Sequence, residues 1–360
     1  MHPQNLKTKL SAYGKTSLKP KPRSQTRELE ILTELREAHE YGLHSFSAPD
    51  QVFLTPQLKI EREKILFFDV ECIELGFGIN NIPYLIGMAS FENEKLKITR
   101  ILSNTPLKEP EALEFLEEYW KNYDAIITYN GKSFDIPLIK SRYALFEKSH
   151  PHRHQTHMDL YHVLKKIIDL DRYRLKDTER NILHFERLND LSGEFSGQAY
   201  FEWLQHDSRD LLNQIIQHNA VDLQSMASLA LILNNKIADF LSGNEEVFRQ
   251  WRMYRLFSQP SHEICLKNVQ WLHKKNANDF FQAGMAAKKT GRFLKAYLYF
   301  RRAYGRGKKN GLIEALVLLR KQFHRHDLAI KLAEKYLAKE EYHTQHKLLN
   351  QLRILRKIRK

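Results

Sequence analysis

The stretch KILFFDVEC, residues 64–72, constrains the fold more than any other feature of this chain. Its apolar run, Ile65 to Phe68, is typical of a strand buried on both faces, yet the strand ends in Asp69 and Glu71. Residues two apart on a strand point to the same side, so the two carboxylates share a face. Buried charge is costly unless it is paired, hydrogen-bonded or bound to a metal. We therefore expect a cation beside them. If this motif is taken alone, the alternative is that the two carboxylates lie at the end of the strand and are exposed to solvent.

The segments that follow predict a mixed α/β arrangement. IPYLIGMASF and LKITRILSN complete an antiparallel meander, and EPEALEFLEEYWKNY is an amphipathic helix with Pro110 in its first turn. DAIITYNG is a fourth apolar strand that ends at the turn pair Asn130-Gly131. Helices are expected around 136–147, 159–168, 175–184 and 208–240. This order of elements along the chain, three antiparallel strands followed by a helix and a further strand, is similar to that of ribonuclease-H-like domains.

A second acidic motif lies in ITYNGKSFDIP. Asn130-Gly131 could make a hairpin turn, but the residues after it do not alternate as a return strand requires. We predict a loop that enters a helix, with Asp135 facing the end of the first strand. Phe134 would be the packing anchor that fixes Asp135.

A third motif, QHNAVDLQSM, belongs to the long helix. Its core stripe can be traced through Ile215, Asn219, Asp222 and Met226, which places Asp222 on the buried side. His218 lies one turn before Asp222 on nearly the same face. An inward acid and histidine indicate a reactive site, but they can equally be a satisfied core pair.

Together the motifs resemble the DEDD superfamily of 3′–5′ exonucleases, and the closest likeness is to YprB-like ribonuclease-H-like domains, over about residues 62–240. The blocks that carry it are FFDVEC, IPYLIGMASF, YNGKSFDIPLI, MDLYHVLKK, RLKDTERNI and HNAVDLQSMASL. The resemblance implies hydrolysis of DNA or RNA phosphodiester bonds with two Mg²⁺ or Mn²⁺ ions, which favour oxygen ligands. Asp69 would bridge both ions, with Glu71, Asp135 and Asp222 completing their ligands. Two ions about 4 Å apart serve the attacking and the leaving oxygen.

One departure from the family concerns the group that activates water. Members carry a tyrosine four positions before the last aspartate or a histidine five before it, whereas His218 has the tyrosine spacing. A histidine can orient or deprotonate water, and Asn219 is an alternative. A weakened or vestigial nuclease fold that acts as a nucleic-acid-binding or protein-interaction adaptor is therefore the rival hypothesis.

Other polar residues are expected to support the site. The resemblance places Asp159 beside the active site as a supporting group, and Asn130 and Asn219 are assigned the same role. Glu179 is expected to be an orienting or helix-surface acid. The histidine-rich stretch SHPHRHQTHMD could hold zinc, but alternating histidines in a polar loop are more often exposed to solvent.

The net charge of +14 is unevenly distributed. Residues 1–60 carry 9 Lys and Arg against 6 Asp and Glu, residues 61–244 carry 21 against 28, and residues 245–360 carry 27 against 9. A strongly basic segment beside an acidic one indicates that one part binds a polyanion. Nucleic acid, as single strands or 3′ ends, is the expected partner, because phosphate contacts require only a density of Lys and Arg.

Three domains are predicted. Residues 1–60 form a basic, partly flexible arm with a short helix over 28–41; residues 61–244 form the ribonuclease-H-like exonuclease domain. Residues 245–360 form a basic all-α domain that resembles tetratricopeptide repeats, with small and aromatic residues such as Ala283, Gly284, Ala296 and Phe300. Such a domain could also bind a protein partner.

The composition favours a soluble cytoplasmic protein. The chain has two cysteines, too few for a disulfide framework. No early segment resembles a signal peptide, and nothing approaches eighteen consecutive apolar residues. The tail HTQHKLLNQLRILRKIRK is a basic amphipathic helix whose leucines are expected to dock on the preceding hairpins. Binding to an anionic membrane surface through the basic ends is a third hypothesis.

Overall fold

The structure is a computed structural model in two compact units, and each unit is considered by itself. It describes residues 29–37, 50–56, 58–73, 81–93, 95–151, 155–188, 190–191, 193–251, 253–256, 277–337 and 342–358. Of the predicted basic arm, residues 1–28, 38–49 and 57 lie outside these residues, as do His152 and His154 of the histidine-rich stretch. The first unit combines the strand near residue 30 with Arg62–Asp159 and Ile182–Ser228.

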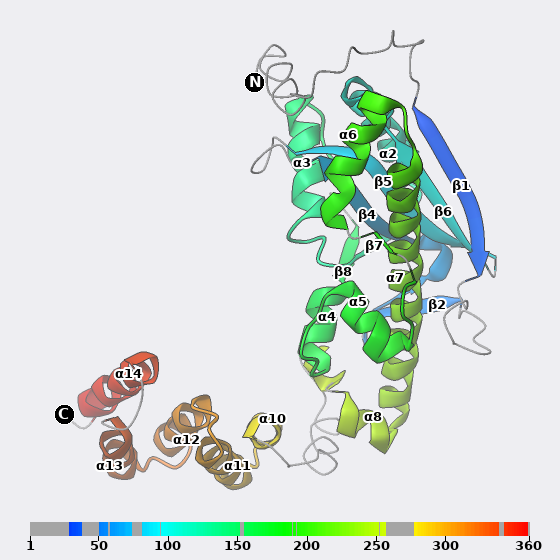
Figure 1. The fold of residues 1–360 in the computed structure, drawn as a ribbon. Coiled ribbons are helices and arrows are strands. Elements are labelled where there is room, and N and C mark those ends of the chain that lie inside the picture. Colours follow the sequence, from blue (N-terminus) through cyan, green and yellow to red (C-terminus); the bar gives the residue numbers. More distant parts are fainter. Residues whose placement is uncertain are drawn as a thin grey trace. The chain divides into compact units, whose positions relative to one another are not determined.

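A six-stranded mixed sheet forms the first unit, in the order β1-β6-β5-β4-β7-β8 (Figure 1). The predicted meander consists of β4 (Ile65–Ile73), β5 (Ile82–Glu92) and β6 (Lys95–Leu102), which pair antiparallel. β7 (Ala125–Thr128) runs parallel to β4, and β8 (Thr156–Asp159) runs parallel to β7. The predicted fold class is thereby confirmed, although β8 was assigned to a loop in the sequence.

β1 (Glu30–Glu37) corrects the predicted helix over 28–41. It pairs antiparallel with β6, and its burial alternates, with Leu32 partly buried between the exposed Ile31 and Thr33. The apolar residues of this segment fit both a helical and an alternating period. Pairing to the free edge of β6 decides the outcome, because it satisfies the backbone groups of both strands.

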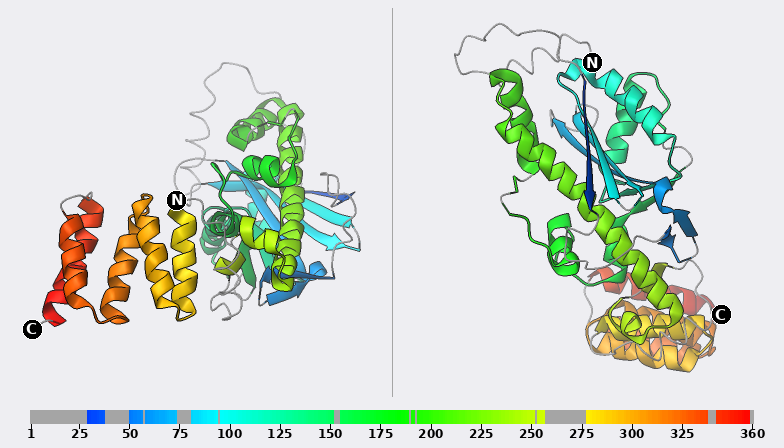
Figure 2. Two further views of the ribbon diagram at one scale, coloured as in Figure 1. Left: turned by 90° about the horizontal axis from the view of Figure 1, so that it is seen from below. Right: turned by 90° about the vertical axis from the view of Figure 1, so that its right-hand side faces the viewer.

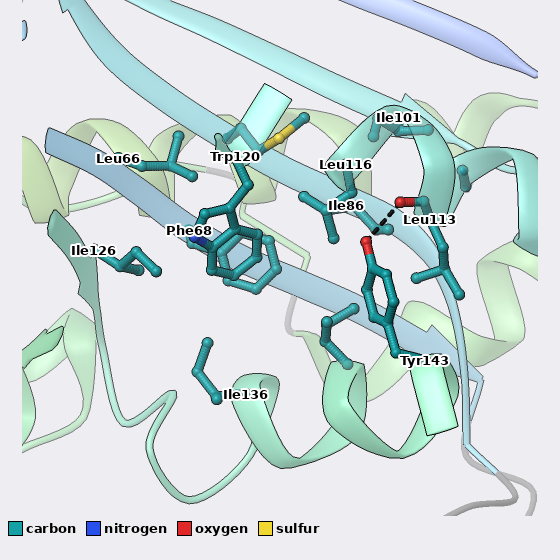
Figure 3. Packing of buried hydrophobic residues seen from close by; sticks show 13 residues of the cluster. Leu66, Phe68, Ile86, Ile101, Leu113, Leu116, Trp120, Ile126, Ile136 and Tyr143 are labelled. Carbon is teal, nitrogen blue, oxygen red and sulfur yellow. Dashed lines mark hydrogen bonds between the residues drawn. The ribbon is translucent and has the colours of Figure 1, made fainter. Parts of the chain in front are cut away.

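Helices cover both faces of this sheet (Figure 2, right). On one face, α2 (Glu109–Trp120) and α3 (Asp135–Leu145) pack on alternate residues of β4 and β5. Trp120 lies against Phe68, with ring centroids 4.7 Å apart, and both are fully buried (Figure 3). The opposite face carries α6 (Ser196–His206), which the sequence did not predict, and the first half of α7 (Asp210–Ser242). The face that holds Asp69 and Glu71 is the one covered by α6 and α7.

Short helical segments complete the architecture. They are η1 (Arg62–Lys64), η3 (Pro106–Lys108), η5 (Gly193–Phe195) and η6 (Met253–Leu256). The second unit contains the hairpin of β2 (Gln51–Thr55) and β3 (Leu58–Glu61), and the helices α4 (Leu160–Ile167), α5 (Leu175–Thr178) and α8 (Glu245–Gln250). A π-helical turn, η4 (Glu179–Leu183), follows α5. The predicted domain boundaries at residues 61 and 244 stay a prediction.

The end of the chain is helical, as predicted, and successive helices stack side by side (Figure 2, left). The helices are α10 (Ala277–Lys289), α11 (Phe293–Gly305), α12 (Asn310–Lys321), α13 (His326–Leu337) and α14 (Tyr342–Ile358). Gly284 permits the close approach of α10 and α11, since a Cβ there would lie 2.6 Å from the Phe300 ring. Leu348, Leu352 and Leu355 of α14 are buried as expected, whereas Leu349 is exposed.

One expectation about a single residue can be compared directly with the structure. Glu179 is buried, so it is not a surface acid. Among the helices that the structure describes, none is long and apolar enough to cross a bilayer.

Candidate active site

The first acid, Asp69, is held by an amide from α7. Asn219 donates from Nδ2 to Asp69 Oδ2 at 2.7 Å, and the Asn219 side chain is fully buried. The strand residue paired with Asp69 is Gly87. A Cβ at Gly87 would lie 2.2 Å from Asn219 Oδ1, so a glycine is required for the amide to reach Asp69. Asn219, proposed as an alternative water activator, therefore acts in this structure to orient a carboxylate.

Glu71 is supported from α6. Its carboxylate accepts a hydrogen bond from the Ser196 side chain. Ser196 Oγ lies 2.7 Å from the hydroxyl of Tyr84, and the Tyr84 ring stacks on Tyr200 with centroids 4.3 Å apart. A buried serine and two buried tyrosines thus fix the orientation of Glu71 from behind.

Asp135 begins α3 and reaches back to β4. The Val70 backbone N–H donates to Asp135 Oδ1 at 3.2 Å. The preceding turn is tight: a Cβ at Gly131 would lie 2.9 Å from Asp135 Oδ2. Phe134 is 67% exposed, so the prediction that it anchors Asp135 by packing was wrong. Its place beside Asp135, with an exposed ring, instead makes it available to a ligand.

Asp159, at the end of β8, fastens the loop that leads to Asp135. Its two carboxylate oxygens accept the backbone N–H groups of Asn130 at 2.9 Å and Lys132 at 3.0 Å. Asn130 adopts a left-handed conformation with φ of 62°, which asparagine tolerates better than most residues. Asp159 is buried, and its two oxygens are used in holding this turn. Asn130 contributes its backbone to the turn.

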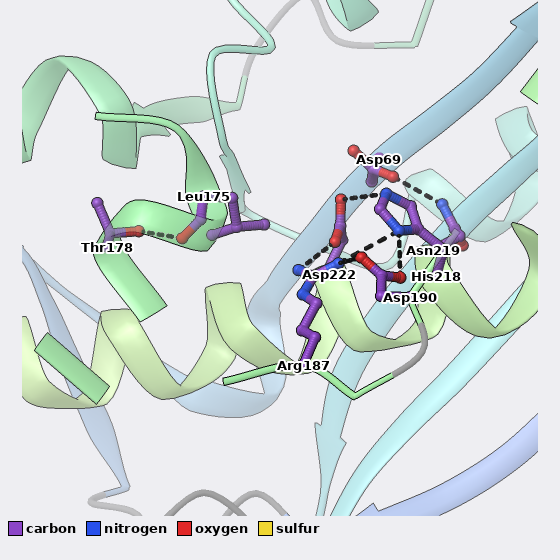
Figure 4. Close-up of polar contacts among 8 residues, drawn as sticks. All are labelled: Asp69, Leu175, Thr178, Arg187, Asp190, His218, Asn219 and Asp222. Atoms are coloured by element: carbon purple, nitrogen blue, oxygen red, sulfur yellow. Dashed lines mark hydrogen bonds and ion pairs between the residues drawn. The ribbon is translucent and has the colours of Figure 1, made fainter. Parts of the chain in front are cut away.

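The fourth acid, Asp222, belongs to a network that includes two residues missed in the sequence (Figure 4). His218 Nδ1 lies 2.7 Å from Asp190 Oδ1, and His218 Nε2 lies 3.6 Å from Asp222 Oδ2. Arg187 Nη2 lies 2.5 Å from Asp222 Oδ1, and Arg187 Nη1 lies 3.4 Å from Asp190 Oδ2. Arg187 and Asp190 are contributed by an irregular segment with no apolar period, so no pattern singled them out.

The acids raise one another's affinity for protons. Burial raises the pKa of Asp69 well above its ordinary value, and the negative charges of Asp222, Asp135 and Glu71 add to this effect. Burial raises the pKa of Glu71 to about 7 although the Ser196 hydrogen bond opposes it. Burial also raises the pKa of Asp135 to about 7, against the hydrogen bond from Val70. The predicted acids of β4, α3 and α7 are thus brought together, and their charges are poorly compensated.

The donor chemistry of this site fits a hard divalent cation. All four acids offer oxygen, the ligand that Mg²⁺ and Mn²⁺ prefer. Asp222 Oδ1 is buried and has no partner of hydrogen-bond geometry, despite its ion pair with Arg187. Yet nowhere in the described ranges do three His, Cys, Asp or Glu side chains converge closely enough to hold a metal ion. The carboxylates are instead turned toward Asn219, Ser196, the Val70 N–H and Arg187.

The histidine-rich segment is only partly described. His157 Nε2 lies 2.8 Å from Thr128 Oγ1, across the neighbouring strands β8 and β7. This contact gives His157 a structural partner within the sheet. Two of the four histidines lie outside the described residues, so the suggested zinc site stays a prediction.

Sequence comparison finds likenesses for this part of the chain. Residues 66–234 match the profile of the RNase_H superfamily. YprB of Bacillus subtilis, an uncharacterized protein, is 28% identical over 257 residues, which cover 67% of this chain and 62% of that protein. A DNA polymerase of Methanocaldococcus jannaschii is 29% identical over 158 residues, which cover 36% of this chain and 10% of the polymerase. The chain therefore spans less than two thirds of the length of either relative.

Structural comparison finds a weaker likeness. The family B DNA polymerase of Pyrobaculum calidifontis has a TM-score of 0.38 and 13% identity, with 63% of this chain and 29% of that chain covered. This likeness is too low to define either fold or function. The sheet order, the flanking helices and the superfamily match agree with one another on a ribonuclease-H-like fold. Residues 66–234 therefore form a ribonuclease-H-like domain, which this chain joins to a C-terminal all-helical region.

Proposed function

We propose that the ribonuclease-H-like domain is a metal-dependent 3′–5′ exonuclease of the DEDD type. The observation that carries the proposal is the cluster of acids from β4, α3 and α7: burial and the charges of neighbouring acids raise the pKa values of Asp69, Glu71 and Asp135, and Asp222 is one of those neighbours. A fold gains nothing in stability from such a cluster, so a cation that relieves the repulsion is its expected use. Asp69, Glu71, Asp135 and Asp222 would hold Mg²⁺ or Mn²⁺, which when bound supplies the nucleophilic hydroxide and stabilises the leaving oxygen.

The surrounding residues suit a water-activating role for His218. His218 Nδ1 lies 2.7 Å from Asp190 Oδ1 and 3.3 Å from Arg187 Nη1, and Nε2 is directed toward Asp222. An imidazole oriented by a carboxylate can receive a proton from water at neutral pH. The contact to Asp190 offers a way for a histidine at the tyrosine spacing to be fixed in place.

Phe134 extends the proposal to the substrate. Its ring is 67% exposed directly before Asp135, and aromatic rings bind unpaired bases by stacking. A 3′-terminal base that stacks on Phe134 would place its phosphate beside the acids. This arrangement favours single strands or frayed ends over intact duplex, because bases in a duplex already stack on one another.

The basic helical region is proposed to retain the strand. Among its cations, Arg302 and Arg306 lie over the Phe280 ring, at 5.9 and 4.5 Å, and Lys308 lies 5.7 Å from the Phe281 ring. These three cations form no ion pair with an acid in the described part of the chain. Their charge is therefore available to phosphates. A tetratricopeptide-like role for the same helices in binding a protein partner stays part of the proposal.

The test of function uses 5′-labelled and 3′-labelled single strands of DNA and RNA with Mg²⁺ or Mn²⁺. A 3′–5′ exonuclease shortens the 5′-labelled strand into a ladder and releases the 3′ label as a mononucleotide, and EDTA abolishes both products. Mononucleotides released from the 5′ end would contradict the polarity. The absence of product with either metal, together with salt-sensitive binding, would favour the second candidate, a nucleic-acid-binding adaptor with a vestigial nuclease fold. The tyrosine-spaced His218 and the ion pair at Asp222 are the observations that favour this candidate.

A further inference from the structure

The least expected contact of the site is the ion pair between Arg187 and Asp222. Arg187 Nη2 lies 2.5 Å from Asp222 Oδ1, and the side chains are only 6% and 16% exposed (Figure 4). A second carboxylate, Asp190, lies 3.4 Å from Nη1 of the same guanidinium. The arginine is therefore held inside the protein by two acids, one of which belongs to the proposed metal site.

A guanidinium in this position competes with a metal ion for the same oxygen. Both are attracted by the charge of Asp222, and two cations in direct contact with one carboxylate repel each other strongly where water is excluded. The ion pair also accounts for the geometry of the cluster, in which Asp222 is turned to Arg187 rather than to the other acids. In the described ranges, no three acids converge in a metal-binding arrangement.

The structure also offers the arginine another position. Arg187 and Asp190 line a depression of about 320 Å³, whose further walls include Leu188, Leu191 and Val221. Leu188 is 89% exposed, so this side of the segment is open to solvent. A guanidinium that leaves Asp222 can turn toward this depression and keep Asp190 as its partner.

We propose that Arg187 is a built-in counterion of Asp222 that a divalent ion must displace, so that one metal position is filled more weakly than the other. The inference rests on the proposed metal site. Arg187 is thus a positioning residue. It balances the negative charge of Asp222 before a metal ion binds, and it sets the metal concentration at which the weaker position is filled.

Mn²⁺ binding to the full-length protein, measured by calorimetry and by the free-ion EPR signal, tests this inference. Arg187→Gln keeps amide donors for Asp190 and Asp222 but removes the charge, and Arg187→Met removes both. Each variant should bind the weaker Mn²⁺ at least about tenfold more tightly than the wild type, a normal size for coupling between two sites. Arg187→Lys should stay close to the wild type, because it restores the charge.

The matched control is Arg174→Gln, which removes an arginine that pairs with Asp177 at 2.9 Å but is itself 70% exposed. It should leave Mn²⁺ affinity unchanged. Thermal unfolding gives a second readout, in which Mn²⁺ should raise the melting temperature more in Arg187→Gln than in the wild type. If the wild type binds Mn²⁺ and Arg187→Gln binds it no better, the inference on Arg187 fails and the metal site stands. If neither protein binds Mn²⁺, the metal site itself fails, and the inference with it.

Discussion

The α/β unit buries its important charges, whereas the helices α10–α14 expose theirs. In the first, Asp69, Glu71 and Asp135 have pKa values raised by burial. Residues 245–360, which contain the second, carry 27 Lys and Arg against only 9 Asp and Glu, and Arg302 and Arg306 are exposed. The contribution of each buried charge depends on its exact position, so a single substitution in the acid cluster should have a large effect on activity. Exposed charges act through their number, so single substitutions should have small and additive effects.

The largest effect is expected from Asp69→Asn. The amide removes a negative charge at the centre of the acid cluster, where the charges of Asp222, Asp135 and Glu71 all act on Asp69. We expect nuclease activity to fall by on the order of 10³-fold, as for other losses of preorganised charge stabilisation. Glu118→Gln is the control, because Glu118 is 75% exposed and pairs with Lys121, the residue that follows α2. Equal activity of the two variants would show that the acid cluster is not the site of hydrolysis.

Gly87→Ala is expected to have the next largest effect. A methyl group at this position would lie 2.2 Å from Asn219 Oδ1, so the amide must move away from Asp69. The loss of an outer group that orients a metal ligand typically costs 10–100-fold in activity or metal affinity, and we expect a loss of about that size. The steady-state rate at several Mn²⁺ concentrations measures it.

Gly197→Ala is the matched control for Gly87→Ala. It places a methyl group on α6 in open space, with no atom within 4 Å. This variant should keep the wild-type rate. Wild-type behaviour of Gly87→Ala would mean that Asn219 does not position Asp69.

The helical region is expected to respond more weakly and in proportion to the number of charges removed. The variant to test replaces three cations together by glutamine: Arg302, Arg306 and Lys308. Single-stranded nucleic acid should bind roughly tenfold more weakly near 0.1 M salt, and the slope of log K against log salt should fall by about 2. The same number of substitutions at cations paired with acids should change binding little; these are Lys97, Lys121 and Arg174. An unchanged salt slope would exclude the α11–α12 surface as a phosphate contact.

The two regions also differ in how far the sequence predicted them. The run from Ile65 to Phe68 predicted a buried strand, and neighbouring apolar segments predicted the meander and the strand that follows it, whereas β1 was expected to be a helix and β8 a loop. The stacked helices followed from the spacing of small and aromatic residues such as Ala296 and Phe300. In both cases a repeated apolar period carries the information, because packing acts on every residue of the element.

The supporting residues of the site could not be predicted in this way. Asp69, Glu71, Asp135 and Asp222 stood out because each interrupts or borders an apolar pattern. Arg187 and Asp190 lie in an irregular segment, and their contacts to the site are made with Asp222 and His218, which are distant in sequence, so their role depends on tertiary structure. Phe134 shows the opposite error: an apolar residue beside an acid suggested packing, but the ring is exposed.

The smallest expected effect concerns the pH dependence of stability. Burial raises the pKa of Glu71 and of Asp135 to about 7 in the folded protein, from ordinary values of 4.5 and 3.8. The folded state therefore holds protons that the unfolded state has already lost between about pH 4 and 7, and stability must fall as pH rises through this window. In EDTA, the melting temperature should therefore decrease from pH 5 to pH 7.5.

Asp135→Asn isolates one part of this pH effect. The asparagine keeps an oxygen for the Val70 N–H but cannot ionise, so the melting temperature should fall less steeply with pH than in the wild type. Arg302→Gln, in the exposed helical region, is the control. It removes a charge without altering a buried carboxylate, so the slope of the melting temperature against pH should not change. Saturating Mn²⁺ should reverse the trend in the wild type, because a bound cation favours the ionised carboxylates and its stabilisation grows as pH rises. Parallel curves for Asp135→Asn and the wild type would mean that the buried acids do not set the stability of this unit.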